Sequence, residues 1–235
     1  MVEYRSFRNT DPPLLVDLWN TSPLGRGAVQ LRSAMLLERY VFSKPYFDPA
    51  GLILAQEGDN VLGFGHAGGF QSADGSQAQG VICAILVHPT HRRRGIGSEL
   101  LRLCENYLTE RGAKQLFAGP QAGLNPFYAG LYGGCDTPGF LMSDEHAEPF
   151  LRHHNYRVRD VIVVLERKLG QPLRLCDPRL PSLRPRYDVV VGSPRKLGGW
   201  WEECTFGCLE PIEMALEDKA TKAVAGRILF WEMET

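Results

Sequence analysis

The sequence feature that most constrains the fold is the stretch from residue 81 to residue 101. Its first seven residues are apolar and rich in valine and isoleucine, a pattern typical of a buried β-strand. Pro89 follows this strand, and a run of histidine and arginine side chains leads from it to Gly95. Apolar residues at helical spacing begin at Ile96. The stretch therefore predicts a strand, a basic turn that contains glycine, and a helix.

The turn has the features of an anion-binding site. Gly95 and Gly97 have no Cβ atom, so a ligand can approach the backbone closely. The first N–H groups of the helix have no partner within it, and the helix dipole adds positive potential there. Three guanidinium groups, from Arg92, Arg93 and Arg94, match the geometry of phosphate oxygens. A phosphate-bearing ligand is predicted; a solvated basic loop before a surface helix would explain the glycine pair alone equally well.

The full pattern Arg92-x-x-Gly95-x-Gly97 lies between a Val-x-Pro strand end and an amphipathic helix. It resembles the acyl-CoA diphosphate motif of the GNAT superfamily of N-acyltransferases, and the resemblance covers residues 1–170. It implies an α/β (α+β) fold in which helices flank a twisted mixed sheet with splayed central parallel strands.

The resemblance also implies which residues bind the co-substrate, acetyl-CoA or another short acyl-CoA. Backbone groups of Leu86 and Val87 are implied to meet the pantetheine arm and the thioester. The implied diphosphate site consists of Arg92, Arg93, Arg94, Gly95, Ile96, Gly97 and Ser98. Backbone N–H groups near the end of the strand can stabilise the oxyanion that forms when an amine attacks the thioester. No metal is expected.

Hydrophobic periodicity predicts the other elements of the first domain. A hairpin joins two apolar strands around Gly58-Asp59-Asn60. The strand after the central helix runs parallel to the central strand, because a helix connects the two. The predicted strands are residues 3–7, 51–57, 61–70, 81–87 and 114–118, and further helices are predicted up to residue 20 and over residues 29–42.

A second motif follows at residues 125–132. Its spacing resembles the family's Asn-x-x-Ala-x-x-Leu-Tyr helix, which implies that Asn125 contacts the pantetheine arm and that Tyr132 faces the thioester sulfur. A phenol can protonate the thiolate that leaves, so Tyr132 is the predicted general acid. The aromatic side chains of this segment would also serve as ordinary core.

An alternative alignment places the family's fourth helix at residues 144–154, because residues 150–156 also resemble the end of that helix. Leu151 would then take the tyrosine position, and no general acid would remain there. We prefer residues 125–132, because only they supply asparagine and tyrosine together. On this choice residues 133–154 are an insertion, and residues 156–168 form the long final strand.

The general base is harder to identify, since the central strand contains no acidic residue. Glu57, His66 and His88 are candidates. His153 and His154 suggest a metal site by composition only. Because no third ligand matches them, we interpret this pair as a solvated helix end.

Composition excludes several classes of protein. The net charge of −1 argues against a nucleic-acid-binding surface over the whole protein. The six cysteines include no Cys-x-x-Cys pair, which indicates reduced thiols rather than a disulfide framework or a metal site. No apolar run approaches the ~20 residues of a membrane span, and the first residues lack the core of a signal peptide. We therefore expect a cytoplasmic protein.

The last quarter of the chain repeats the beginning. Residues 171–186 form a linker rich in proline and arginine, and residues 187–235 contain a strand, a helix and a hairpin. Within this segment, residues 215–218 and 224–229 align with residues 54–57 and 61–66. The arrangement resembles the tandem GNAT units of mycothiol-synthase-like proteins, with an incomplete second unit that ends before any diphosphate turn.

The incomplete unit predicts an unpaired edge. Its last strand, residues 224–233, is apolar and would lie where a complete unit places another strand. We expect this edge to be covered by the strand at residues 156–168 or by a second chain, so a homodimer through the half unit is one expectation.

Together these features predict an N-acetyltransferase that moves an acetyl group from acetyl-CoA to a small-molecule or peptide amine by direct attack. The alternative is a GNAT-fold module that binds acyl-CoA as a sensor or assembly unit. The alternative is supported by the missing general base. The sequence does not identify the acceptor.

Overall fold

The computed structural model describes residues 1–70, 78–119, 123–124, 126–132, 139–163, 165, 170, 178–193 and 199–232. The chain forms two compact units, Met1–Val164 and Leu165–Glu234. In the described part of the chain, no helix is both long and apolar enough to cross a membrane.

The strands of the first unit form one mixed sheet in the order β1-β2-β3-β4-β5. Neighbouring strands from β1 to β4 are antiparallel, whereas β4 and β5 are parallel. The strands are β1 (Glu3–Ser6), β2 (Leu52–Glu57), β3 (Asn60–Phe70), β4 (Gln79–Val87) and β5 (Gln115–Ala118). The predicted mixed sheet is confirmed.

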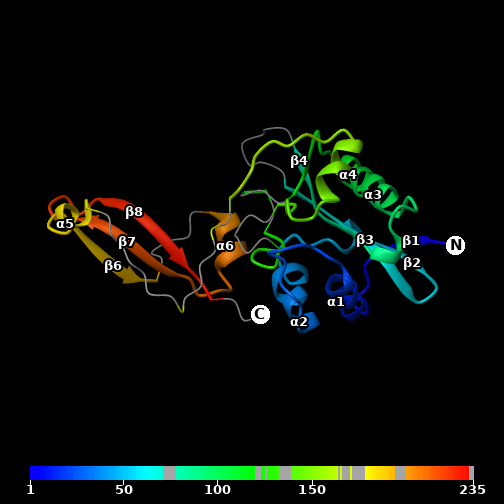
Figure 1. The fold of residues 1–235 in the computed structure, drawn as a ribbon, viewed down its shortest axis with the longest axis horizontal. Coiled ribbons are helices and arrows are strands. Elements are labelled where there is room, and N and C mark those ends of the chain that lie inside the picture. Colours follow the sequence, from blue (N-terminus) through cyan, green and yellow to red (C-terminus); the bar gives the residue numbers. More distant parts are fainter. Residues whose placement is uncertain are drawn as a thin grey trace. The chain divides into compact units, whose positions relative to one another are not determined.

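Helices cover both faces of this sheet, with α3 and α4 on one side and α1 and α2 on the other (Figure 1). The helices are α1 (Pro12–Thr21), α2 (Ala34–Leu37), which continues as a π-helix (Glu38–Phe42), α3 (Ile96–Glu110) and α4 (Ala147–His153). Leu100, Cys104 and Leu108 recur at helical spacing on α3 and are completely or almost completely buried against the sheet. This packing fixes the start of α3 at the end of β4.

The helix predicted over residues 29–42 begins only at Ala34. The Ser33 hydroxyl accepts a hydrogen bond from the Met35 N–H (3.2 Å) and caps the helix there. Upstream, the Val29 N–H donates to the Leu131 carbonyl (2.9 Å). The first part of the predicted helix is therefore a connection that pairs with a distant segment.

A buried ion pair joins β1 to the start of α1. Both terminal guanidinium nitrogens of Arg5 donate to the Asp11 carboxylate (2.7 and 2.8 Å), and the Arg8 N–H donates to it as well (2.7 Å). Burial alone would raise the pKa of Asp11, but these bonds outweigh it and lower that pKa below its ordinary value. The pair therefore stabilises the fold only while Asp11 is ionised.

We predict that Asp11→Ala lowers the free energy of unfolding by about 2 kcal/mol. Breaking a fully buried ion pair costs roughly 3–5 kcal/mol. The expected loss is smaller here, because Arg5 is partly exposed and water can solvate its charge when Asp11 is removed. Since the folded pKa is depressed, the contribution of Asp11 is complete above about pH 4 and is lost as pH falls further. Urea unfolding followed by circular dichroism at pH 7 and pH 3 measures it. Asp17→Ala, at an exposed site on the same helix, is the control, and equal losses for both variants would contradict the prediction.

The second unit contains a three-stranded antiparallel sheet in the order β6-β7-β8. Its elements are α5 (Leu180–Leu183), β6 (Tyr187–Gly192), α6 (Trp200–Phe206), β7 (Ile212–Asp218) and β8 (Val224–Phe230). The segment predicted as a linker thus contains the short helix α5. Strand, helix and hairpin follow one another as in β1, α1, β2 and β3.

The two sheets share a detail of register. The pairing of β2 with β3 shifts between Ala55 and Gln56, and that of β7 with β8 shifts between Leu216 and Glu217. In the alignment of the two halves these positions correspond. The residues that pair with them correspond as well. Ala55 pairs with Gly63 as Leu216 pairs with Gly226, and Gln56 pairs with Val61 as Glu217 pairs with Val224.

The final strand predicted over residues 156–168 is not observed. Residues 157–163 and 165 belong to no helix or strand, and the rest of the predicted strand lies outside the described residues, apart from Tyr156. Val161, Ile162 and Val163 are each more than half exposed. An apolar pattern favours a strand, but the strand forms only where a neighbouring edge accepts its hydrogen bonds.

Candidate active site

The central parallel strands separate after four paired residues. Residues 79–82 of β4 pair with residues 115–118 of β5, and the Gly119 N–H donates to the Ile82 carbonyl (2.9 Å). Beyond Ile82, β4 continues to Val87 without a partner on this side among the described residues. The edge of β4 that faces β5 is therefore unpaired at the carboxyl end of β4 among the described residues, and we call this unpaired edge the gap. The carboxyl ends of strands are where α/β sheets bind their ligands.

The alternation of hydrogen bonds shows which backbone groups face the gap. The His88 N–H donates to the Leu62 carbonyl (2.8 Å), so the backbone groups of His88 point toward β3. Leu86, whose backbone groups the family resemblance implied to meet the pantetheine arm, pairs with Phe64, so its backbone groups face β3 as well. Backbone groups of successive residues point to opposite edges of a strand, so those of Ile85 and Val87 point toward the gap.

The turn between β4 and α3 places glycine where a side chain would be strained. Gly95 has a φ of 82° and open space around its Cα, and it precedes the first residue of α3. Among the described residues no side chain caps this helix, so its first N–H groups are available to a ligand. The geometry is that of an anion site at a helix N-terminus.

The three arginines of the turn differ in their surroundings. Arg92 is partly buried, and its Nε donates to the Val87 carbonyl (3.1 Å), which ties the turn to the end of β4. Arg93 and Arg94 are exposed. Only the latter two can therefore turn to an anion without breaking a contact within the turn.

Gly97 has a different role from Gly95. A Cβ atom at Gly97 would lie 3.4 Å from the Phe150 ring on α4 and 3.6 Å from a methyl group of Val87. These are ordinary van der Waals distances, so a methyl group would fit at Gly97. Unlike Gly95, Gly97 thus lies close to α4 and to the end of β4.

The segment predicted as the second motif is not a helix. Asn125 lies outside the described residues, and residues 127–131 form turns. Tyr128 (φ 63°) and Gly130 (φ 75°) are left-handed, and a helix cannot continue through such residues. The segment therefore reverses direction and pairs with the loop after α1, through a bridge between Tyr132 and Ala28.

The phenol of Tyr132 lies in an aromatic wall with its proton available. Its ring packs edge-on against Trp19 (6.1 Å between centroids), and its oxygen accepts a hydrogen bond from the Leu141 N–H (3.2 Å). Burial raises the pKa of Tyr132 to about 12, although the Leu141 bond opposes this shift. Tyr132 is therefore neutral near pH 7 and can donate a proton.

The helix that packs against the start of α3 is α4. Phe150 lies against Gly97, and the Ser98 hydroxyl lies 3.0 Å from Nε2 of His154. Leu151, the alternative position of the family's tyrosine, is on this helix. The sequence interpretation missed His154 because it treated the two histidines as a solvated helix end. The signal was the alternative alignment of residues 150–156.

The candidate bases are engaged in other contacts. His66 is buried, its Nδ1 lies 3.0 Å from the Tyr128 hydroxyl, and burial lowers its pKa to about 3. The Glu57 carboxylate binds the Met1 amino group (2.9 Å). His88 Nδ1 lies 2.8 Å from the Thr90 hydroxyl. The contacts of His66 indicate a core histidine rather than a base.

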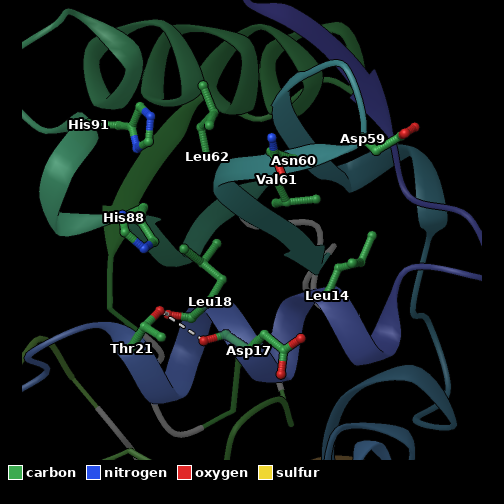
Figure 2. A pocket seen from close by; sticks show the side chains of 10 residues that line it. All are labelled: Leu14, Asp17, Leu18, Thr21, Asp59, Asn60, Val61, Leu62, His88 and His91. Atoms are coloured by element: carbon green, nitrogen blue, oxygen red, sulfur yellow. Dashed lines mark hydrogen bonds between the residues drawn. The ribbon is translucent and has the colours of Figure 1, made fainter.

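A shallow groove of about 290 Å³ lies beside the turn. Figure 2 shows His88 and His91 on one side of it, residues of α1 along one wall, and Leu62, Val61, Asn60 and Asp59 along the other. The residues of α1 and its end that line it are Leu14, Asp17, Leu18 and Thr21. The groove begins at His88, one residue beyond the backbone groups that face the gap.

The described side chains form no metal-like cluster, and the two cysteines that the structure describes in the first unit are packed in the core. No group of three histidine, cysteine, aspartate or glutamate residues converges in the part of the chain that the structure describes. Burial raises the pKa of Cys83 and also that of Cys104, to about 12. Both thiols are therefore protonated and packed.

Comparison with known proteins places the chain in context. Residues 15–133 match the model of the acetyltransferase (GNAT) family. Among solved structures, a transcriptional regulator from Bacillus halodurans C-125 is similar over 71% of this chain and 99% of its own, with 16% identity and a TM-score of 0.51. Curated protein sequences give no match.

Two further solved structures are similar at lower scores. An aminoglycoside acetyltransferase from an uncultured soil metagenomic sample matches 72% of this chain and 97% of its own, with 16% identity and a TM-score of 0.47. A ribosomal-protein-alanine N-acetyltransferase from Brucella melitensis biovar Abortus 2308 is similar over 72% of this chain and 100% of its own, with 14% identity and a TM-score of 0.48.

Proposed function

The chain belongs to the acetyltransferase (GNAT) family, and from this membership we propose that its first unit transfers an acetyl group from acetyl-CoA to an amine by direct attack. The observation that carries the proposal is the position of the uncapped start of α3 at the end of β4, beside the gap between β4 and β5. A diphosphate at the helix start would direct the attached thioester along β4 into that gap.

The residues of the chain fit such a co-substrate. Exposed Arg93 and Arg94 lie beside the free N–H groups of the first turn of α3, so positive charge and donors coincide. The backbone groups of Ile85 and the N–H group of Val87, which face the gap, can bind the pantetheine arm as a neighbouring strand would; the Val87 carbonyl already accepts from Arg92. An N–H group on the same edge can stabilise the oxyanion of the tetrahedral intermediate.

Proton transfer is the second part of the proposal. Tyr132 donates its proton to the departing thiolate; the phenol stays neutral far above pH 7, so this proton is present throughout the working pH range. If α4 instead supplies the family's fourth helix, Leu151 occupies the tyrosine position and water must protonate the thiolate. The amine loses its proton to solvent in either case, since the candidate bases have other partners.

The acceptor is a small-molecule or peptide amine. The groove beside the turn supports this size class, because its aliphatic floor and polar rim can hold the body of a small ligand. Asp17 and Asp59 at its rim are exposed carboxylates that attract a protonated amine. Its volume is near the lower end of the range for small-molecule sites.

Calorimetry with acetyl-CoA, combined with thiol release over a panel of amines, tests the proposed function. Saturable binding and release of CoA with at least one amine is the expected result. Binding without turnover over the whole panel would favour the alternative, a sensor or assembly module that binds acyl-CoA. An absence of binding would reject both.

We propose that the second unit is a partial copy of the first and that its open edge pairs with a second molecule. In the alignment β8 corresponds to β3, and β3 pairs antiparallel with β4. The second unit has no counterpart of β4 among the described residues. Val224, Ile228 and Phe230 on β8 are 40–58% exposed. Two β8 strands related by a twofold axis would also be antiparallel.

Sedimentation at micromolar concentrations is expected to show a dimer. Ile228→Lys places a charge on the edge strand and is expected to give a monomer with an unchanged circular dichroism spectrum. Val189→Lys, at a similarly exposed position on the outer strand β6, adds the same single charge and is the control. A wild-type chain that stays monomeric up to about 100 μM would contradict the proposal.

A further inference from the structure

The first turn of α3 is held by the end of α4. The Phe150 ring lies 3.4 Å from the position that a Cβ atom would take at Gly97, within this turn. About two turns further along α3, the Tyr156 hydroxyl donates to the Glu105 carboxylate (2.8 Å). The Tyr156 N–H donates to the Leu151 carbonyl (3.0 Å), which closes α4. The residue between these anchors therefore has a fixed position relative to the proposed diphosphate site.

That residue is His154. Its Nε2 atom lies 3.0 Å from the hydroxyl oxygen of Ser98, the third residue of α3, and the contact is partly buried. The imidazole packs against the Phe150 ring (4.9 Å between centroids) and against the His153 ring (5.2 Å). His153 is exposed, whereas His154 is partly buried. The two neighbouring histidines thus differ, since only His154 contacts the diphosphate site.

The direction of this hydrogen bond decides what Ser98 can offer a ligand. A hydroxyl has one proton and two lone pairs. If Ser98 donates its proton to the imidazole, only lone pairs remain for a ligand, and these repel phosphate oxygens. If Nε2–H donates to Ser98, the serine proton is free for a phosphate oxygen. A bound anion selects the second arrangement, because charge-assisted bonds are the stronger ones.

We propose that His154 is a positioning residue for the diphosphate of acetyl-CoA. Its Nε2–H donates to Ser98, so that the serine hydroxyl donates to the diphosphate. This inference rests on the proposed function of the first unit. It predicts a role in binding the co-substrate and none in the transfer step, because His154 acts only through Ser98.

Two substitutions of His154 separate this role from packing. His154→Phe keeps an aromatic ring against Phe150 but removes the donor, whereas His154→Gln keeps an N–H donor at a similar reach. His154→Phe is expected to raise the Kd for acetyl-CoA and its KM about tenfold, with kcat within about twofold of wild type. His154→Gln is expected to stay within about threefold in both constants. His153→Phe is the matched control and is expected to change neither.

Two further experiments complete the test: a double-mutant cycle with Ser98, and a reaction with a shortened acetyl donor that lacks the diphosphate. In a Ser98→Ala background, His154→Phe is expected to cause no further loss, because the group on which it acts is absent. With S-acetylpantetheine, which has no diphosphate, His154→Phe and wild type are expected to react at equal rates. Equal loss in the Ser98→Ala background, unchanged affinity of His154→Phe, or slower reaction with S-acetylpantetheine would overturn the inference.

The outcomes for wild type keep the two proposals apart. If wild type binds acetyl-CoA and His154→Phe binds it equally well, only the role of His154 fails. If wild type does not bind acetyl-CoA, the proposed function fails, and the role of His154 fails with it. Thermal melting of each variant shows whether it is folded.

Discussion

Replacing Gly97 with glutamate is expected to weaken acetyl-CoA binding about a hundredfold, which corresponds to about 2.7 kcal/mol. Gly97 is the second residue of α3. A glutamate there places a carboxylate at the helix start, where it accepts hydrogen bonds from the free N–H groups and is favoured by the helix dipole. The protein would thus supply its own anion to the site, and the diphosphate would have to displace it.

Gly97→Ala is the matched control for this result. Its methyl group would lie 3.4 Å from the Phe150 ring and 3.6 Å from Val87, so it fits with small adjustments. Its Kd is expected to stay within about threefold of wild type. The double variant Arg93→Ala/Arg94→Ala changes only exposed side chains and is expected to weaken binding about tenfold, with a smaller dependence on salt. Unchanged affinity of Gly97→Glu, measured by calorimetry, would reject the diphosphate site.

Replacing Tyr132 with phenylalanine is expected to lower kcat about a hundredfold while the KM for acetyl-CoA changes little. The phenol is the proposed acid, and general acid catalysis contributes roughly a factor of 10²–10⁴. Because the pKa of Tyr132 is raised to about 12, the phenol keeps its proton across the usable pH range. The kcat of wild type is therefore expected to show no loss from this group between about pH 7 and pH 10.

Tyr128→Phe is the control for Tyr132→Phe, because it removes a second phenol from the same turn. The Tyr128 hydroxyl contacts His66 in the core, so this change is expected to affect stability more than kcat. Steady-state kinetics with an active amine gives both constants. Equal kcat values for Tyr132→Phe and wild type would remove the acid role and favour the alignment that places Leu151 at the tyrosine position.

The sequence predicted the central part of the fold because its signals are local. The strand, the glycine turn and the helix of residues 81–110 are contiguous, and their packing depends on apolar spacing that the sequence shows directly. The hairpin of β2 and β3 likewise follows from a turn between two apolar runs. Such elements form where they are predicted, because the residues that determine their conformation lie within the element itself.

The features that were wrongly predicted or missed depend on distant partners. Residues 157–163 have the composition of a strand but form none. Residues 126–132 have the spacing of a helix, but Tyr128 adopts a left-handed conformation that tyrosine rarely takes. The contact of His154 with Ser98 joins positions 56 residues apart. A local pattern cannot show any of these three features.

Amide hydrogen exchange of the full chain, with and without acetyl-CoA, tests the central claim most directly. The claim is that the diphosphate binds at the start of α3 and the thioester arm lies along the open edge of β4. Saturating acetyl-CoA is expected to slow exchange at residues 85, 87 and 93–98, while exchange in β6, β7 and β8 stays the same. Unchanged exchange at residues 93–98, in the presence of bound acetyl-CoA, would contradict the account.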